Sequence, residues 1–158
     1  RVELDDRDIR GGEKTWSWVK KGIPIRVEVG PRDMEKDSVF MARRDQGVKD
    51  KESKAKADFI TEISALLESI QTNLYNRAKA FQESNTHTTN SYDDFKNIIK
   101  KGGFVKCGWD GTNETEEKIK KDTKATIRCI PFNQDTESLK CIYSDTQAKY
   151  QVIFARAY

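Results

Sequence analysis

The sequence predicts an α/β unit followed by a smaller α+β unit, and three patterns predict this order. Residues 25–29 alternate branched apolar and charged side chains, which is the period of a half-buried strand. Apolar residues then recur at helical spacing from residue 59 to residue 81. Short helical and strand patterns follow one another between residues 92 and 157, as in a small α+β domain.

The chain opens with two short elements. Residues 2–5 indicate a strand that runs into a polar turn. Residues 13–21 indicate a helix, because Lys20 and Lys21 suit the negative end of its dipole and Gly22 suits its C-cap.

The strand at residues 25–29 leads into a charged turn. Its apolar side chains are expected on the core face: Ile25, Val27 and Val29. Arg26 leaves the strand on the polar face, and Gly30-Pro31 then breaks the strand into a turn. This turn presents Arg32 and Asp33 side by side at the end of a rigid strand, a favourable place for recognition. An ordinary solvated turn is the competing interpretation, and the pattern alone favours it.

A long helix dominates the middle of the chain. Residues 38–44 indicate a second strand, and residues 45–58 indicate a charged connector. The helix is predicted at about residues 59–82 from one apolar stripe: Phe59, Ile63, Leu66, Leu67, Ile70, Leu74, Ala78 and Phe81. We expect it to pack on its own domain rather than on a partner. Polar residues 84–91 follow as a linker that carries the only histidine, His87.

The C-terminal elements are shorter. An amphipathic helix is predicted at residues 92–101, and Gly102-Gly103 ends it. The remaining elements are a strand, a second short helix and three further strands: 104–109, 114–121, 125–132, 140–143 and 150–157.

Composition restricts the class of function. The chain has 158 residues, of which 35% are charged, and its 29 Lys and Arg against 26 Asp and Glu give a net charge of +3. That bias is too small for a protein that holds nucleic acid by charge alone. No apolar run approaches the ~20 residues that a membrane helix needs. The three cysteines are odd in number and widely spaced, which favours a reducing compartment over a disulfide framework.

No catalytic motif is found in the sequence. The glycine-rich nucleotide-binding patterns and the nucleophile elbow are absent, and one histidine leaves no Ser/His/Asp or Cys/His set. Asp5, Asp6 and Asp8 lie beside Arg7, so a solvated charged turn explains them better than acid–base catalysis. The tryptophans could stack on bases, yet packing is the favoured interpretation for each: Trp16, Trp18 and Trp109.

Three segments, residues 3–45, 124–132 and 148–158, carry a specific pattern when taken together. The first contains G-x-K…W-x-x-K-G-x-P-x-R-x-E-x-G-P-R-D, and the chain ends on A-R-A-Y. With these motifs the chain resembles the C-terminal part of a prolyl-tRNA synthetase of the archaeal/eukaryotic-like type, which is a class II synthetase. The terminal A-R-A-Y is close to diagnostic of this type.

The resemblance implies a domain organisation and a parent activity. Residues 1–83 would be an anticodon-binding domain, a mixed sheet with helices whose first strand and helix lie upstream of this chain. Residues 84–91 would be a linker, and residues 92–158 the extra C-terminal α+β domain. The parent, a cytoplasmic homodimer without membrane attachment, would join proline to its tRNA using ATP and Mg²⁺. This chain would supply tRNA recognition, because the catalytic domain is not in it.

The resemblance also implies anticodon-reading residues. Family members read the two guanines of the proline anticodon from positions that match Arg26, Arg32 and Asp33. An arginine can donate to guanine O6 and N7, and a carboxylate can accept from N1 and N2. Two family positions differ: Thr15 replaces an aromatic residue and Val19 replaces a glutamate. The stacking contact of the aromatic residue and the guanine contact of the glutamate in other family members are therefore not implied for this chain.

At the C-terminal side the resemblance is incomplete for zinc. Zinc-bearing members hold four cysteines as two pairs, of which Cys107 and Cys141 match one each, while Ser144 stands at the partner position of Cys141. Cys129 is not one of the four. We expect no zinc, as the single spacing of the cysteines also indicates. The resemblance further implies that Tyr158 docks toward the active site of the parent.

Two other functions stay open from the sequence. One is a stand-alone protein-interaction module derived from an anticodon-binding domain, and the other is a free-standing metal-binding domain. The incomplete sheet at the start of the chain favours the tRNA-binding part of a ligase over both. A reading frame that continues upstream into a class II catalytic domain would decide for that part.

Overall fold

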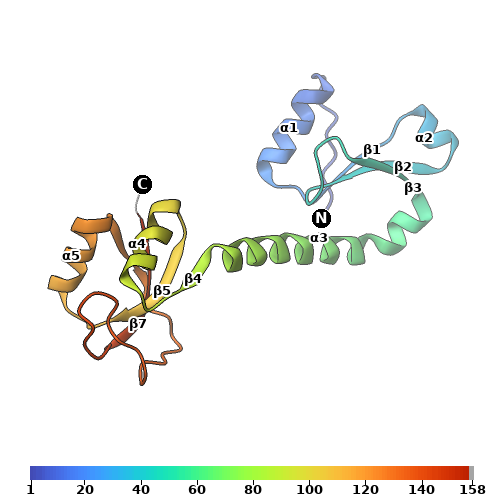
Figure 1. Cartoon of the computed structure of the whole chain (residues 1–158). Helices are drawn as coiled ribbons and strands as arrows, with labels where there is room; N and C mark the ends of the chain where they lie inside the picture. Colours follow the sequence, from blue (N-terminus) through green and yellow to red (C-terminus); the bar gives the residue numbers. More distant parts are fainter. Residues whose placement is uncertain (157–158) are drawn as a thin grey trace. The chain divides into compact units, whose positions relative to one another are not determined.

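A computed structural model describes residues 1–156 of the chain. The chain divides into a first unit, Arg1–Ala78, and a second unit, Lys79–Tyr158. Each unit contains one sheet, as the ribbon in Figure 1 shows. Among the described residues, no helix is both long enough and apolar enough to cross a membrane.

The first unit is built on an antiparallel sheet of three strands in the order β1-β2-β3. The strands are β1 (Ile25–Glu28), β2 (Ser38–Arg43) and β3 (Lys51–Ala55). The helices are α1 (Gly11–Lys21), α2 (Pro31–Glu35) and α3 (Lys56–Ser84). The predicted α/β character of this unit is confirmed.

Helix α1 ends where its sequence predicts. Lys20 and Lys21 occupy the last turn, and Gly22 follows with a φ of +77°, which a residue with a Cβ adopts only under strain. The N–H of Gly22 donates to the carbonyl of Val19 at 3.0 Å. This αL cap satisfies a carbonyl that the helix itself leaves open.

Strand β2 carries the buried part of the first sheet. The side chain of Met41 is fully buried, and Val39 and Ala42 are nearly so. On β1, by contrast, Val27 is 41% exposed and Val29, which lies after the end of the strand, is 59% exposed. Val27 nevertheless pairs with the fully buried Met41, so it lies on the predicted core face, where it is only partly covered. For Val29 the prediction is wrong, because this residue lies beyond the strand and is mostly exposed.

Three local predictions in this unit are corrected by the structure. Residues 2–5 form no strand. Pro31 begins the helix α2 instead of a simple turn, because its fixed φ suits the first helical position. The charged connector contains β3, whose five residues pair with β2 in antiparallel register.

Helix α3 is longer than the predicted 59–82, since it begins at Lys56 and ends at Ser84. Of its apolar stripe only Ile70 is fully buried. Polar contacts hold the helix to the rest of the first unit. Arg43 Nη2 donates to Ser69 Oγ at 3.0 Å, Asn73 Nδ2 donates to Asp45 at 2.8 Å, and Lys54 pairs with Glu62 at 2.6 Å. Several large apolar residues of the helix stay exposed: Ile60, Leu67, Tyr75 and Phe81.

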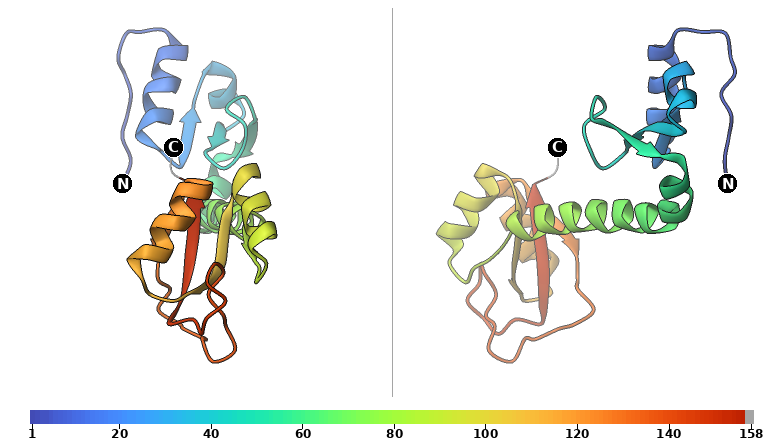
Figure 2. Two further views of the ribbon diagram at one scale, coloured as in Figure 1. Left: turned by 60° about the vertical axis from the view of Figure 1, so that its left-hand side comes forward. Right: turned by 90° about the vertical axis from the view of Figure 1, so that its right-hand side faces the viewer.

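The second unit is a two-layer α+β domain, as its sequence predicts. Its strands lie in the order β4-β5-β7-β6, and Figure 2 shows β7 in red beside β5 in yellow. The strands are β4 (Thr86–Thr88), β5 (Phe104–Trp109), β6 (Ala125–Cys129) and β7 (Tyr150–Arg156). The helices are α4 (Tyr92–Lys101) and α5 (Asn113–Thr123).

Both helices and the sheet contribute to one core. Phe95 of α4, Ile119 of α5, and Val105 and Phe154 of the sheet are fully buried in the same cluster. Phe95 meets Phe154 edge to face with ring centroids 5.4 Å apart. Helix α4 begins at a true cap, because the Ser91 hydroxyl accepts from the N–H of Asp94.

Two further predictions are corrected in the second unit. The polar linker 84–91 contains β4, which pairs in parallel with β5. Residues 140–143 form isolated bridges instead of a strand, with Cys141 bridged to Gly108 and Lys140 bridged to Gln147.

Candidate functional site

The strand β1 places Arg26 on the sheet face that points away from α3. Arg26 pairs with Ala42, while the neighbouring β2 residue Arg43 reaches Ser69 of α3 from the opposite face. The polar position predicted for Arg26 is therefore observed. Its Nη2 donates to the carbonyl of Val48 at 3.3 Å. Its Nη1 is buried and finds no acceptor among the described residues.

Helix α2 positions Arg32 and Asp33. Asp33 Oδ2 accepts from the N–H of Gly30 at 2.9 Å, which closes the first turn of the helix. Arg32 is exposed and Asp33 is half-buried. No ion pair joins these two residues in the described chain, so the interpretation of a turn that merely pairs its own charges is not supported.

Further charges lie on the same sheet face as Arg26. Lys51 of β3 lies across Ala42 from Arg26 in the register of the sheet. Its ammonium pairs with Glu28 at 2.6 Å and lies 5.5 Å from the centroid of the Phe40 ring. The face thus combines two cations, one carboxylate and an aromatic ring.

A second charged cluster lies at α1, and the sequence analysis missed it. Trp18 Nε1 donates to Asp5 at 2.6 Å, and Arg7 donates to the same carboxylate through two nitrogens at 2.8 Å. The hydrogen bond from Arg7 is the main cause that holds the pKa of Asp5 well below its usual range; burial opposes it, and the hydrogen bond from Trp18 adds to it. Lys21 Nζ lies 4.0 Å from the centroid of the Trp18 ring. The aspartate is therefore a structural partner of the tryptophan, not a freely solvated residue.

The three tryptophans differ in burial. Trp109 is 9% exposed and belongs to the core of the second unit, so its packing role is confirmed. Trp16 is 55% exposed beside a cavity of about 650 Å³ that Arg7 and Lys20 also line. Trp16 is therefore not part of the core of the described chain, in contrast to the packing interpretation. Thr15 and Val19, the two positions that differ from the family, are half-buried on the same helix.

In the second unit, the structure brings Cys107 and Cys141 together. Both are almost fully buried, and Cys141 bridges Gly108, the residue next to Cys107. Burial, followed by the neighbouring Cys141, raises the pKa of Cys107 to about 12, so its thiol stays protonated. Cys129 is exposed.

Ser144 is engaged in a network of hydroxyls around Asp110. Its Oγ donates to Asp110 Oδ2 at 2.8 Å, and Thr115 Oγ1 donates to the same oxygen at 2.7 Å. Partial burial alone would raise the pKa of Asp110, but the hydrogen bonds from Thr115, Thr112 and Ser144 outweigh it and hold the pKa at about 2. Two thiols, a hydroxyl and a carboxylate already bound by hydroxyls do not match the thiolate set of a structural zinc site.

We expect purified, untagged protein to contain no stoichiometric zinc. Within residues 1–156, no group of three or more His, Cys, Asp or Glu side chains is arranged to hold a metal ion. A structural zinc site needs four protein ligands, whereas only two of the family's four ligand positions carry a cysteine here, Cys107 and Cys141. Elemental analysis measures the content directly, and one zinc per chain after dialysis would contradict the expectation. Tyr158, for which the resemblance implies docking, lies outside the described residues.

Two family descriptions match the chain. Residues 1–66 match "Anticodon binding domain", and residues 92–158 match "Prolyl-tRNA synthetase, C-terminal". Proteins named proline–tRNA ligase align along the whole chain. The one from Roseiflexus sp. (strain RS-1) is 46% identical over 160 residues, and the one from Bdellovibrio bacteriovorus is 40% identical over 163 residues.

This chain covers 33% and 32% of those two relatives, so it spans about a third of their length. A further relative, the proline–tRNA ligase of Chloroflexus aurantiacus, is 43% identical over 160 residues, and this chain covers 33% of its length. The catalytic domain of such a ligase is absent from this chain. The chain belongs to the prolyl-tRNA synthetase family, of which it comprises the anticodon-binding domain and the C-terminal domain.

Proposed function

We propose that this chain recognises the proline tRNA within a longer proline–tRNA ligase, and that Arg26, Arg32 and Asp33 read the anticodon. The observation that carries the proposal is the guanidinium of Arg26, whose Nη1 is buried without an acceptor in the described chain. An unsatisfied buried donor is costly, so such a group is expected to gain a partner when a ligand binds. Guanine offers O6 and N7 as acceptors for this donor.

The geometry of Asp33 supports the other half of the recognition. Its Oδ2 accepts the N–H of Gly30, while Oδ1 accepts no hydrogen bond from a described residue. An ionised carboxylate has about four acceptor positions, so the cap leaves room for the N1–H and N2–H donors of guanine. Anticodon bases are unpaired and present these edges freely.

The parent protein extends beyond this chain, and we propose its activity from its relatives. It attaches proline to its tRNA using ATP and Mg²⁺, with the catalytic domain in the remaining two thirds of the protein. We further propose that the parent is a homodimer in the cytoplasm, and that residues 1–83, 84–91 and 92–158 are its anticodon-binding domain, linker and C-terminal domain. The chain itself then carries no catalytic residue.

A protein-interaction module is the second candidate, and one observation favours it. Helix α3 exposes 64% of Ile60, 61% of Tyr75 and 70% of Phe81 in the described part of the chain. Exposed apolar residues along a helix can mark a surface that a protein partner covers. In that case the chain would bind a protein and show no preference among tRNAs.

A binding experiment separates the two candidates. The 158-residue chain is titrated with a transcript of the proline tRNA and with the same transcript after both anticodon guanines are replaced. We expect the replacement to weaken binding about tenfold or more, since lost base-specific pairs cost ~1–3 kcal/mol each. Equal affinity for the two transcripts would favour the interaction module.

Deletion of Tyr158 in the full-length ligase is expected to lower the rate of proline activation more than it lowers thermal stability. The strand β7 ends at Arg156, two residues before Tyr158 in the sequence, and its inward side chains are buried. The measurements are ATP–pyrophosphate exchange and a melting curve, with Tyr158→Phe as the control that keeps the ring. An unchanged exchange rate in the deletion variant would remove the docking role.

A further inference from the structure

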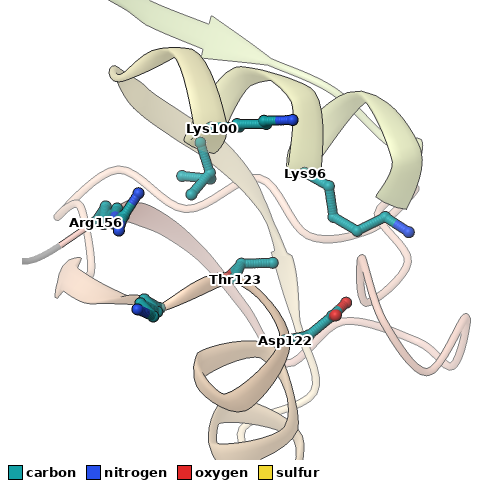
Figure 3. Close-up of a pocket in the computed structure, with 7 residues that line it drawn as sticks. Lys96, Lys100, Asp122, Thr123 and Arg156 are labelled. Atoms are coloured by element: carbon teal, nitrogen blue, oxygen red, sulfur yellow. The ribbon is translucent and has the colours of Figure 1, made fainter.

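The second unit contains an open cavity of about 280 Å³ between α4, the end of α5 and the end of β7. Figure 3 shows Lys96 and Lys100 on α4, with Asp122, Thr123 and Arg156 from the other elements around the same space. Its charged lining residues comprise four cations and one carboxylate: Lys96, Lys100, Lys124, Arg156 and Asp122. The lining therefore carries a net positive charge.

Most of this charge is not neutralised within the described chain. Lys96 pairs with Asp93 at 2.9 Å, and Asp122 accepts a hydrogen bond from Tyr92 at 2.9 Å. Among residues 1–156, no carboxylate forms an ion pair with Lys100, Lys124 or Arg156. Within the described part of the chain these three side chains supply ammonium and guanidinium donors without a carboxylate partner, in a recess that concentrates their field.

Lys124 adds an independent observation. It adopts a φ of +62° directly after α5, and its N–H donates to the carbonyl of Lys120 at 2.8 Å. Glycine is the usual residue at such a C-cap, because the left-handed conformation disfavours any residue with a Cβ. A lysine at this position is unfavourable for the backbone, which points to a use for its side chain.

Helix dipoles explain only part of the cluster. Lys100 lies in the last turn of α4, where a cation is ordinarily stabilising. Arg156 is different, since it lies on β7 paired with Ala125 and is not part of a helix, so a helix dipole does not explain it. Cations from a helix, a cap and a strand thus meet at one recess, although they are far apart in the sequence.

We propose that this cavity binds a phosphate group of an RNA backbone. Lysine and arginine form charge-assisted hydrogen bonds with phosphate oxygens, and such contacts position RNA without reading its sequence. The choice of RNA over other anions rests on the proposed function, because the first unit of the same chain is an anticodon-binding domain. The site gives the second unit a direct role in holding the tRNA.

The test measures the affinity of the 158-residue chain for the proline tRNA transcript as a function of salt. Lys124→Gly removes one cation and places glycine at a position with a left-handed backbone conformation. The melting temperature should therefore stay unchanged or rise, while the affinity for RNA falls. We expect an affinity loss of about three- to tenfold at low salt and a salt dependence reduced by about one ion per lost contact. Arg156→Gln should act in the same direction.

Lys140→Gln is the matched control, because it removes one charge at the opposite end of the sheet. Lys140 precedes Cys141, which bridges Gly108, and Gly108 pairs with Gln151 near the start of β7. This variant should bind RNA with the wild-type salt dependence. If Lys124→Gly and Arg156→Gln also keep the wild-type affinity and salt dependence, the phosphate site does not exist.

Inorganic phosphate distinguishes the source of the phosphate group. At constant ionic strength, it should compete with RNA only weakly, because a single phosphate lacks the other contacts of the tRNA. If it shifts the backbone amide signals of Lys124 and Arg156 while neither variant weakens RNA binding, the cavity is a site for free phosphate and the RNA assignment is wrong.

Failure of this site is distinguishable from failure of the anticodon proposal. Lys124→Gly should lower the affinity for the wild-type transcript and for the transcript without anticodon guanines by the same factor, because phosphate contacts carry no sequence information. If the wild-type chain prefers the transcript with guanines and Lys124→Gly leaves the salt dependence unchanged, only the phosphate site in the cavity is contradicted. If Lys124→Gly reduces the salt dependence but the wild-type chain shows no preference for guanine, only the role of the anticodon residues is contradicted.

Discussion

In the full-length ligase, Arg26→Ala and Asp33→Asn are each expected to lower kcat/KM for tRNA roughly ten- to a hundredfold. The estimate follows from a loss of ~1–3 kcal/mol for each base-specific pair. For Arg26, the change removes the guanidinium whose Nη1 has no acceptor in the described chain. For Asp33, the amide oxygen of the asparagine can still accept from Gly30. The second carboxylate oxygen is replaced by an NH2 group, which donates and therefore cannot accept from the N1–H and N2–H of guanine.

The controls separate recognition from folding and from general charge. Lys36→Ala removes an exposed cation just after α2 and should change kcat/KM by less than either variant, without altering the preference for guanine. ATP-dependent proline activation without tRNA should be nearly unchanged in every variant. If Arg26→Ala and Asp33→Asn keep the wild-type preference for guanine at both anticodon positions, these residues do not read the anticodon.

Gly108→Ala is expected to destabilise the second unit strongly. A Cβ at this position would lie 2.2 Å from the carbonyl oxygen of Lys140 and 2.9 Å from the Cβ of Ala148. The oxygen belongs to the backbone of a segment that is itself tied to β5, because the N–H of Ile142 donates to the carbonyl of Gly108 at 3.0 Å. The segment cannot withdraw without breaking that bond and exposing the buried thiol of Cys141.

The expected cost is about 1–3 kcal/mol or more, as for other overpacked cores. In a unit of this size, each kcal/mol lowers the melting temperature by roughly 4–8 °C. Calorimetry of the 158-residue chain measures it, with Gly11→Ala as the matched control. A Cβ at Gly11 meets nothing within 4 Å, and alanine favours the helix α1, so this variant should be neutral or stabilising. An unchanged melting temperature for Gly108→Ala would contradict the close packing of residues 140–142 against β5.

Elements that depend on local chemistry were predictable from the sequence. Helix α1 follows from its terminal lysines and Gly22, and α3 follows from its apolar stripe, although the helix extends beyond the predicted ends. The polar placement of Arg26 follows from simple alternation along β1. Each of these features is set by neighbours within one or two turns of the chain.

Elements that depend on distant partners were missed. The strand β4 consists of three polar residues, and only its parallel pairing with β5 makes it a strand. Residues 140–143 have the composition of a strand, yet their backbone meets Gly108 and Gln147 through single bridges. Backbone hydrogen bonding between separate segments has no local signature, so no pattern in the sequence marked these pairings.

The family follows from motifs that the sequence alone displays, and the proposal that Arg26, Arg32 and Asp33 read the anticodon rests on the same motifs. Only the tertiary structure showed that Trp16 is exposed, that Arg26 keeps an unused donor, and that Lys100, Lys124 and Arg156 surround one recess. The physical reason is the range of the interactions. Propensity, capping and periodicity act along the chain, whereas burial and the summed field of charges arise only when α4, the end of α5 and β7 are brought together.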